Sequence, residues 1–379
     1  MPKSRKKDIP MPSLGDFQRV TQFAALEATR AVGYSNKGLI DRLATRAMRI
    51  MFNELPGKFH VLHSEGRLDY EDDEDKTGYI PKGSMLGVYR NDPSVAVHAD
   101  IIMDSVDGTS LAAFGKPDAV SAIALVAPGA VYDISGVEEA YFWKVVTDHR
   151  ARDKVYGVLG RYYDQDPFKN EDFYCEVMRA VAIAHGKRPE DLRVMMLDRP
   201  KRHAVIIKAI QKLGVRLTIQ PAGDMMPGIT TCLKDGEYDV VFGAGGSTEL
   251  ILTAAVAKCC KGCVIAQADI PLTNAEMGKQ IYDPGVYGTQ PVLTLDRLIQ
   301  GRVLAIYVTC VTRGYLPEAQ IRENGVVELT TLYFRNNGLT RGRSIEERAI
   351  WQPSTGEPLE ELHKWSEYMV SNDDIQHSR

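Results

Sequence analysis

Short apolar runs alternate with longer amphipathic segments through the second half of this chain, and no other feature restricts its fold as strongly. The expected elements are, in order, a strand at 194–197, a helix at 204–213, strands at 216–219 and 238–242, a helix at 250–259 and a strand at 263–267. Strand–helix–strand alternation is typical of a mostly parallel sheet with helices on its faces. The second half is therefore predicted to be α/β with a parallel sheet.

The first half combines its elements differently and is predicted to be α+β. Residues 17–52 have the apolar spacing of helices, which glycine and polar residues at 33–38 interrupt. The other expected elements are strands at 59–62, 80–88, 95–103 and 119–126 and a helix at 171–185. With a boundary near residue 190, the expected parts are a flexible basic tail at 1–16, a first domain at 17–189, a second domain at 190–343 and a C-terminal extension at 344–379 with an amphipathic helix around 359–370.

Composition and charge exclude several classes of protein. With 379 residues, 44% hydrophobic and 25% charged, the chain has the composition of an ordinary globular protein and the length of two domains. Its net charge of −4 gives no general attraction to nucleic acid or to an anionic membrane. Apolar runs stay well short of the ~18 residues of a membrane span, and the basic residues 3–7 lack the apolar stretch of a signal peptide. We expect a cytoplasmic protein whose partners include neither nucleic acid nor membrane.

The six cysteines are too few for a disulfide framework in a chain of this length. Three of them cluster at Cys259, Cys260 and Cys263, but no second Cys or His pair stands at the spacing of a zinc finger. We expect all six to be core or surface thiols.

The strongest chemical signal follows the predicted strand at 95–103. The chain there reads Asp-Ser-Val-Asp-Gly-Thr at 104–109, which places two carboxylates and a hydroxyl beside a turn. If residues 110–113 open a helix, its unpaired N–H groups suit a phosphate. Two acids, a turn glycine and a helix N-terminus are the groups that metal-assisted hydrolysis of a phosphate ester needs. A plain strand and turn with an N-cap is the alternative.

Two further acids of the first half are candidates for the same chemistry. Glu65 follows the predicted strand 59–62 and precedes a glycine, and Asp69 comes four residues later. One offers a metal ligand and the other an acid that orients water. Lys37 and Asp41 are also four residues apart, and by themselves they predict a surface ion pair.

Two polar turns follow strands of the second half. Residues 199–203 read Arg-Pro-Lys-Arg-His before a predicted helix, where the cations and the helix dipole favour an anion. A solvated basic turn is the alternative. Asp224 ends the other turn, which suits either a substrate hydroxyl or a plain connection.

A glycine-rich turn at 243–246 raises a different class of function. A dinucleotide-binding loop would need Gly or Ala where Thr248 stands, with Asp269 as the ribose-binding acid. Glu249 argues against this function, because its charge would repel a pyrophosphate at the helix N-terminus. A glutamate there is more consistent with a metal ligand. A dinucleotide-binding protein is the alternative from another class.

Taken in order, these motifs resemble the class II fructose-1,6-bisphosphatases, the bacterial GlpX type of the lithium-sensitive phosphatase superfamily, over about residues 17–314. Residues 64–69 are similar to the family's Gly-Glu-Gly-x-x-Asp, 141–144 fit its Tyr-x-x-Lys, and the basic turn fits its Arg/Lys-Pro-Arg-His with one extra residue. The resemblance implies a layered αβαβα sugar-phosphatase fold. It also implies a phosphomonoesterase dependent on Mg²⁺ or Mn²⁺, acting on a small-molecule sugar phosphate or bisphosphate, and a homo-oligomer, either dimer or tetramer.

The resemblance also implies roles for individual residues. The implied metal ligands are Asp41, Glu65, Asp104, Asp107 (where the family usually has Glu) and Glu249. The implied catalytic residues are Asp69, an acid, and Thr109, which orients the attacking water. The implied substrate-binding residues are Lys37, Gly108, Tyr141, Arg199, Lys201, Arg202, Asp224 and Gly246, with Lys201 and Arg202 competing for one role. On this basis 17–189 would bind metal and phosphate, and 190–343 the rest of the substrate.

The departures from the family fall on the substrate side. Trp143 stands where the family usually has Glu, Ala222 stands where an Asp should hold sugar hydroxyls, and residues 73–82 have no family counterpart. The metal carboxylates are all kept. We therefore expect hydrolysis of a sugar bisphosphate of the fructose-1,6- or sedoheptulose-1,7-bisphosphate kind with a shifted preference, and a cyclitol or inositol-type phosphatase as the alternative.

Overall fold

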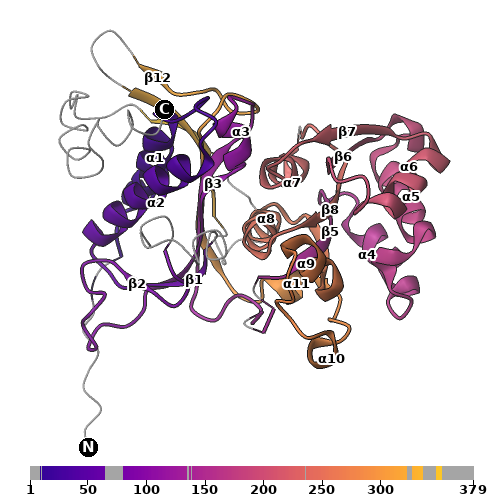
Figure 1. Ribbon diagram of the computed structural model, residues 1–379, viewed down its shortest axis with the longest axis horizontal. Helices are drawn as coiled ribbons and strands as arrows, with labels where there is room; N and C mark the ends of the chain where they lie inside the picture. Colours follow the sequence, from indigo (N-terminus) through magenta and orange to yellow (C-terminus); the bar gives the residue numbers. More distant parts are fainter. Residues whose placement is uncertain are drawn as a thin grey trace, which may run out of the picture. The chain divides into compact units, whose positions relative to one another are not determined.

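The computed structural model describes residue 9 and residues 11–64, 80–134, 136–137, 139–234, 236–321, 327–335 and 347–351. The described residues divide into two compact units, the first formed by those up to 129 together with those from 302 onward, and the second by those of 130–301. Each unit contains one mixed sheet with helices, so the predicted α/β class is confirmed (Figure 1). The division does not fall near residue 190, because the strand that begins at Tyr141 pairs with strands after 240.

The first unit is built on an eight-stranded sheet with the order β12-β13-β11-β4-β3-β1-β2, in which β14 also pairs with β13. Its strands are β1 (Phe59–Ser64), β2 (Met85–Leu86), β3 (Ala99–Asp107), β4 (Val120–Val126), β11 (Val303–Cys310), β12 (Gln320–Ile321), β13 (Val327–Phe334) and β14 (Glu347–Trp351). Its helices are α1 (Leu14–Thr29), α2 (Lys37–Glu54) and α3 (Thr109–Ala113). The pair β1–β3 is parallel, and the other pairs are antiparallel.

Local capping explains where the two long helices of this unit begin. Ser13 and Asp16 form a capping box at the start of α1, and the Asn36 side chain accepts the Leu39 N–H at the start of α2. The two helices pack together and against the sheet (Figure 1). Buried hydroxyls fix α1 to the sheet, since Thr21 Oγ1 lies 2.8 Å from Thr309 Oγ1.

The second unit is built on a six-stranded sheet with the order β10-β9-β5-β8-β6-β7. Its strands are β5 (Tyr141–Thr147), β6 (Arg193–Leu197), β7 (Arg216–Gln220), β8 (Val240–Gly245), β9 (Cys263–Asp269) and β10 (Leu293–Thr294). Its α-helices are α4 (Arg152–Tyr162), α5 (Glu171–His185), α6 (Ala204–Leu213), α7 (Met225–Cys232), α8 (Ser247–Cys260), α9 (Ile270–Met277), α10 (Pro284–Tyr287) and α11 (Leu295–Leu298), with 3₁₀ turns η2 (Pro167–Lys169) and η3 (Pro189–Asp191). Helices α4, α5 and α6 cover one face of the sheet, and α7 and α8 cover the other (Figure 1).

This sheet is mixed rather than mostly parallel as predicted. Strands β6, β7 and β8 are parallel, as their alternation with helices requires. Strand β5 lies between β8 and β9 and is antiparallel to both, so it interrupts the parallel order. β5 lies about a hundred residues before its partners, and the local pattern carried no signal of this pairing.

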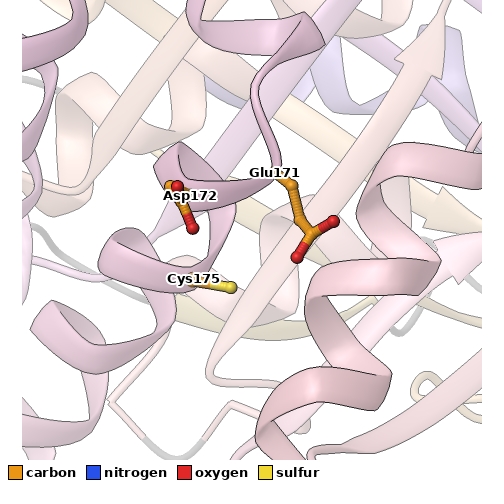
Figure 2. A group of neighbouring side chains, drawn as sticks. All are labelled: Glu171, Asp172 and Cys175. Carbon is orange, nitrogen blue, oxygen red and sulfur yellow. The ribbon is translucent and has the colours of Figure 1, made fainter.

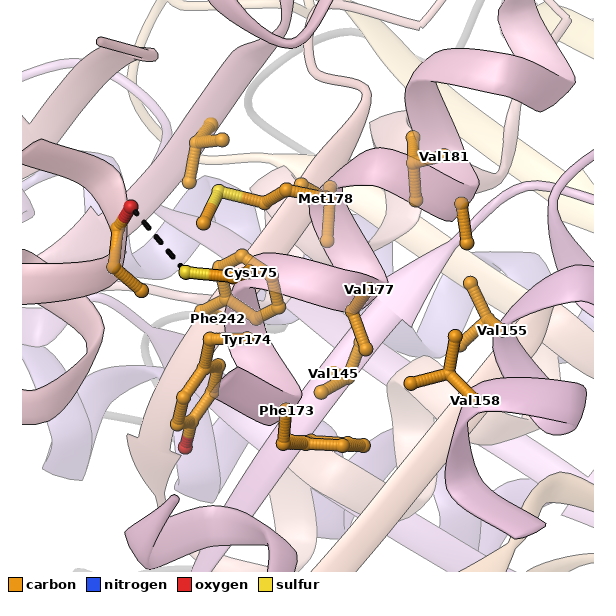
Figure 3. Packing of buried hydrophobic residues seen from close by; sticks show 14 of the residues in the cluster. Val145, Val155, Val158, Phe173, Tyr174, Cys175, Val177, Met178, Val181 and Phe242 are labelled. Carbon is orange, nitrogen blue, oxygen red and sulfur yellow. Dashed lines mark hydrogen bonds between the residues drawn. The ribbon is translucent and has the colours of Figure 1, made fainter. Parts of the chain in front are cut away.

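The core under α4 and α5 is closely packed (Figure 3). Figure 3 shows side chains of both helices meeting Val145 of β5 and Phe242 of β8. The ring of Tyr174 meets that of Phe242 edge-on at 5.3 Å between centroids. This core holds β5 and β8 together, and the candidate residues of this unit lie at the start of β5 and just after the ends of β6, β7 and β8.

Two predicted strands have different limits. The strand expected at 80–88 is reduced to Met85–Leu86, because the surrounding residues form turns. The strand expected at 95–103 is Ala99–Asp107, so it continues through the acidic motif. Residues 1–8 of the tail predicted at 1–16 and the helix predicted around 359–370 lie outside the described residues, and α1 begins at Leu14, inside the range predicted as tail. No helix in the described part of the chain has both the length and the apolar content to cross a membrane.

Candidate active site

Asp104 and Asp107 lie in the last four residues of β3, and both side chains are buried. Asp104 is opposite Ala122 of β4 and Asp107 is opposite Val120, so β3 has one extra residue between the two pairs. Residues three apart on a regular strand point to opposite faces. The extra residue is a β-bulge, and it returns the two carboxylates to one face of the sheet.

Gly108 and Thr109 turn the chain from β3 into α3. The φ of Gly108 is +78°, and a Cβ there would lie 2.9 Å from Leu111 Cδ1, so the turn needs glycine. The Thr109 hydroxyl lies 2.9 Å from Asp41 Oδ1 and 3.0 Å from the Val106 carbonyl oxygen. Because a carboxylate is the stronger acceptor, Thr109 donates its one proton to Asp41 and keeps its lone pairs for another donor.

The remaining predicted residues of the first unit are less informative. Glu65 and Asp69 lie outside the described residues, so their roles stay predictions. Lys37 is exposed in the first turn of α2, one helical turn before Asp41. The structure therefore brings together Asp41 and Thr109, and it places Asp104 and Asp107 on the strand that leads to Thr109.

In the second unit, two carboxylates rest against the glycines that join β8 to α8. A Cβ on Gly246 would clash with Glu249 of the first turn of α8, and a Cβ on Gly245 would clash with the Asp224 carboxylate. Lys144, on β5, is 1% exposed, and its Nζ lies 2.7 Å from Asp224 Oδ2. The side chain of Lys144 lies on the α7–α8 face of the sheet, because Val145 next to it points into the core under α5.

Glu249 lies in an environment that disfavours its charge. Burial raises the pKa of Glu249, the nearby Asp224 carboxylate raises it further, and Lys144 acts in the opposite direction without reversing the shift. Lys144 already pairs with Asp224. The buried Asp224 and the half-buried Glu249 thus share one ammonium group, which is an arrangement that an additional cation would stabilise.

The glycine-rich segment does not form a dinucleotide-binding loop. Gly243 and Gly245 lie inside β8, opposite Lys144 and Phe142 of β5, and are not in the turn that would wrap a pyrophosphate. Asp269, the proposed ribose acid, accepts hydrogen bonds from the Leu272 N–H and the Trp143 indole. The alternative function based on this segment is therefore not supported.

Arg202 is held in place by three partners. It donates to the Ala244 carbonyl oxygen at 3.0 Å and to both carboxylate oxygens of Glu276, and its guanidinium carbon lies 4.7 Å from the Tyr141 ring centroid. Burial raises the pKa of Tyr141, and the positive charge of Arg202 opposes that shift. Tyr141 is therefore a neutral phenol that retains a hydroxyl proton to donate.

His203 and Trp143 complete this end of the sheet. The Nδ1–H of His203 donates to the Leu197 carbonyl oxygen at 3.1 Å, and its Nε2 accepts the Ala244 N–H at 3.2 Å. Burial lowers the pKa of His203 to about 4, so the ring is neutral. The Trp143 indole donates to Asp269 Oδ2 at 2.8 Å and packs edge-on against His203.

The other cations of the basic turn differ in exposure. Arg199 donates to the Pro221 carbonyl oxygen at 3.1 Å and so ties the basic turn to the turn that ends at Asp224. Lys201 is exposed. Of the two residues that compete for one predicted role, Arg202 is thus fixed in the protein and Lys201 reaches solvent.

A different acidic group resembles a metal site by distance alone. Glu171, Asp172 and Cys175 at the start of α5 place one ligand atom each within 4.8 Å of one another (Figure 2). Lys212 Nζ lies 3.1 Å from each of the two carboxylates. Burial raises the pKa of the Cys175 thiol, whose Sγ lies 3.9 Å from the Ala209 carbonyl oxygen. This group is an ion pair at a helix start beside a protonated core thiol.

Two residues of the site were not among those predicted from the sequence. A buried lysine in a strand as apolar as β5 needs a partner, and Lys144 carried that signal. Glu276 on α9 fixes Arg202 from 74 positions along the chain, and nothing in its local sequence indicated the contact.

The model of the family described as bacterial fructose-1,6-bisphosphatase, glpX-encoded, matches residues 13–347. Fructose-1,6-bisphosphatase 1 class 2 of Escherichia coli (strain K12) is 29% identical over 335 residues, which cover 86% of this chain and 91% of that protein. Fructose-1,6-bisphosphatase class 2 of Haemophilus influenzae is 27% identical over 337 residues, which cover 86% and 92%. Fructose-1,6-bisphosphatase 2 class 2 of E. coli K12 is 29% identical over 325 residues, which cover 83% and 92%.

Proposed function

The chain belongs to the glpX-encoded family of bacterial fructose-1,6-bisphosphatases, and on this premise we propose that it hydrolyses a sugar bisphosphate with the help of Mg²⁺ or Mn²⁺. Water replaces the sugar oxygen on one phosphorus atom, the sugar keeps that oxygen as a hydroxyl, and inorganic phosphate leaves. The observation that supports this most is the series at the end of β3. There, Asp104 and Asp107 share one face, and Thr109 donates to Asp41 directly after them.

We propose Glu65, Asp104, Asp107 and Glu249 as ligands of divalent cations, with Asp41 as a ligand of a further one. All five are carboxylates, and oxygen ligands are preferred by Mg²⁺ and Mn²⁺. The proposed set contains no thiolate or imidazole, which would favour zinc. The burial of Asp104 and Asp107 and the raised pKa of Glu249 support the fit, because a bound cation offsets the cost of burying several acids.

The residues of this chain then orient the reactants. When bound, the cation would polarise the phosphate and lower the pKa of a nearby water. Thr109 directs its proton to Asp41, so its oxygen accepts a hydrogen from the attacking water and aims the water lone pair at phosphorus. Asp69 or Asp41 is proposed to support Thr109 in orienting this water. Gly108 keeps side-chain atoms away from the reacting phosphate.

The substrate side is assigned to residues of the second unit around β5 and β8, together with Lys37 of α2. Lys37, Arg199, Lys201 and Arg202 provide positive charge for the phosphates. Tyr141 and Asp224 provide a donor and an acceptor for sugar hydroxyls, and Gly246 allows close approach of the backbone. Because Glu276 already holds Arg202, we propose Arg202 as the fixed donor and Lys201 as the mobile one.

We further propose that fructose 1,6-bisphosphate is not the best substrate of this chain. Trp143 donates to Asp269, so a glutamate at position 143 would instead bring two carboxylates together. Position 222 carries no hydroxyl acceptor, since it is alanine. A site built to bind a substrate hydroxyl discriminates strongly against its absence, so losing these acceptors should change the preferred sugar.

A side-by-side substrate comparison tests the proposal. Phosphate release from fructose 1,6-bisphosphate, sedoheptulose 1,7-bisphosphate and inositol and cyclitol phosphates would be measured with Mn²⁺ or Mg²⁺ and again with a chelator. We expect metal-dependent release, with another substrate exceeding fructose 1,6-bisphosphate in kcat/KM. An advantage of fructose 1,6-bisphosphate of roughly tenfold or more would contradict the shifted preference. Absence of metal-dependent release from the whole panel would contradict the function itself.

A further inference from the structure

A cavity of about 270 Å³ opens at the other end of the second unit's sheet. Its wall includes Arg150, Lys187, Arg193, Lys234 and Asp239. Asp239 directly precedes β8, and Arg150 follows β5 by three residues. Tyr141 begins β5, and Glu249 follows the far end of β8. At about 3.3 Å per residue, the length of β5 separates the cavity from Tyr141 by roughly 20 Å, so within this unit the cavity is distinct from the candidate residues at the other end of the sheet.

Beneath the cavity lies a buried chain of hydrogen-bonded side chains, two carboxylates and one imidazole, formed by Asp148, His185 and Asp239. His185 Nε2 lies 3.0 Å from Asp148 Oδ1, and His185 Nδ1 lies 3.1 Å from Asp239 Oδ1. All three side chains are at most 3% exposed. Each ring nitrogen faces a carboxylate oxygen, so both must donate and the ring is an imidazolium.

The pKa shifts of the three groups agree with this geometry. Burial alone would lower the pKa of His185, but the hydrogen bonds to Asp148 and Asp239 raise it above its ordinary value. Burial would raise the pKa of Asp239, but hydrogen bonds from His185, Lys187 and Arg193 hold it well below its ordinary range. Both carboxylates are therefore charged, and His185 already compensates one of them.

The positive charges around Asp148, His185 and Asp239 outnumber the negative charges of the two carboxylates. Arg150 Nε lies 2.5 Å from Asp148 Oδ2, and Lys187 Nζ lies 2.7 Å from Asp239 Oδ1. Arg193 contacts Asp239 at 3.4 Å and is half exposed, and Lys234 is exposed and forms no ion pair with a described residue. In a chain whose net charge is −4, such a concentration of positive charge is not an effect of composition.

We propose that this cavity binds a small phosphate-bearing metabolite. The excess positive charge on its wall matches an anion of two or more charges. Arg150 and Arg193 supply planar forks that suit phosphate oxygens, and Lys234 supplies a mobile point charge. The volume is near the lower limit of small-molecule sites, which fits a compact ligand. The buried chain of Asp148, His185 and Asp239 fixes the wall, because it holds the arginines and Lys187 in place.

Calorimetric titration of the full-length chain with inorganic phosphate, in Mg²⁺ buffer, tests this site. The Asp104→Asn variant removes a proposed metal ligand, and phosphate binding at the cavity should persist in it. Lys234→Glu should weaken that binding by about tenfold. Lys154→Glu makes the same charge change at an exposed position of α4 and should leave the affinity within about twofold of the parent. Malonate, a dicarboxylate whose charge is at least that of phosphate, should bind at least tenfold more weakly than phosphate.

Three results would overturn the proposal. Loss of all phosphate binding in Asp104→Asn would assign the binding to the active site. Equal affinities in Lys234→Glu and Lys154→Glu would show that the cavity is not the binding site. Malonate binding as tight as phosphate would contradict the assignment to phosphate chemistry. Because both lysines are exposed, thermal unfolding of the two variants should match the parent and exclude misfolding as the cause.

Discussion

Both ends of the second unit's sheet bury carboxylates, but the pKa values of these carboxylates are shifted in opposite directions. At the end where β5 finishes, His185, Arg150 and Lys187 lower the pKa of Asp148 and Asp239 against the effect of burial. At the end where β8 finishes, Asp224 and Glu249 share Lys144, and the pKa of Glu249 is raised. A carboxylate whose charge is fully paired stabilises the fold. A carboxyl group whose charged form the fold disfavours is typical of a binding or catalytic site. This difference is expected if Asp148 and Asp239 are structural and Glu249 is, as proposed, a metal ligand.

The largest expected effect comes from removing the disfavoured acid. Glu249→Gln should lower kcat by at least roughly 10³-fold, since a metal ligand supports several kcal/mol of transition-state stabilisation. The unfolding free energy in chelator should not fall, because the variant removes a charge that burial disfavours. Phosphate release and urea unfolding measure the two quantities. A Glu249→Gln enzyme with parental kcat would show that catalysis does not need the Glu249 carboxylate.

The opposite pattern is expected at the other end. Asp239→Asn should lower the unfolding free energy by about 3–5 kcal/mol, because it leaves buried cationic partners without their anion. Its kcat at saturating metal should stay within about twofold of the parent. Asp191→Asn is the matched control, since Asp191 pairs with Arg188 on the surface, and it should change stability little. Equal stabilities of the two variants would show that Asp239 is not structural.

In the first unit, the hydroxyl of Thr109 is the group expected to affect catalysis next most strongly. Thr109→Val keeps the shape of the side chain but removes the hydroxyl that donates to Asp41, so kcat should fall by roughly 10²-fold with little change in KM. Thr109→Ser keeps the hydroxyl and should recover most of the loss. If valine and serine variants have the same kcat, the hydroxyl does not take part in the chemical step.

Two buried histidines should give the smallest effects, and of opposite pH dependence. The raised pKa of His185 means that its stabilisation is complete below about pH 6.5 and is lost as pH rises through the raised value. The pKa of His203 is lowered to about 4, so its stabilisation is present above about pH 6.5 and is lost as pH falls toward 4. Each glutamine variant should differ from the parent by on the order of 1 kcal/mol in its favourable range. Unfolding curves between pH 4 and 9 measure the difference in unfolding free energy between each variant and the parent. If both differences change in the same direction with pH, the two pKa shifts are not of opposite sign.

Local signals in the sequence predicted the helices well. Helix α5 begins after Asn170, which caps it, and ends at Gly186 with φ +63°; α6 ends at Gly214 with φ +64°. Both helices have the predicted limits, because their caps lie within the segments themselves. The acidic motif at 104–109 was also recognisable, since a strand, a turn glycine and a hydroxyl stand next to one another.

Contacts between distant segments were not predictable in the same way. The antiparallel place of β5 depends on pairing with strands about a hundred residues away. The bulge that brings Asp104 and Asp107 to one face depends on the register with β4. Asp148, His185 and Asp239 are separated by tens of residues, so no spacing rule joins them. Glu65 and Asp69 were predicted by resemblance and lie outside the described residues.

The most direct test is a Mn²⁺ or Mg²⁺ titration of thermal unfolding with three metal-stripped proteins: the parent, Glu249→Gln and Asp239→Asn. At a hundredfold excess of metal over its Kd, a ligand that binds the folded state adds about 2.7 kcal/mol. We expect this gain for the parent and for Asp239→Asn, and a clearly smaller one for Glu249→Gln. A parent protein that neither metal stabilises, or a Glu249→Gln protein that gains as much as the parent, would contradict the proposed role of Glu249 as a metal ligand.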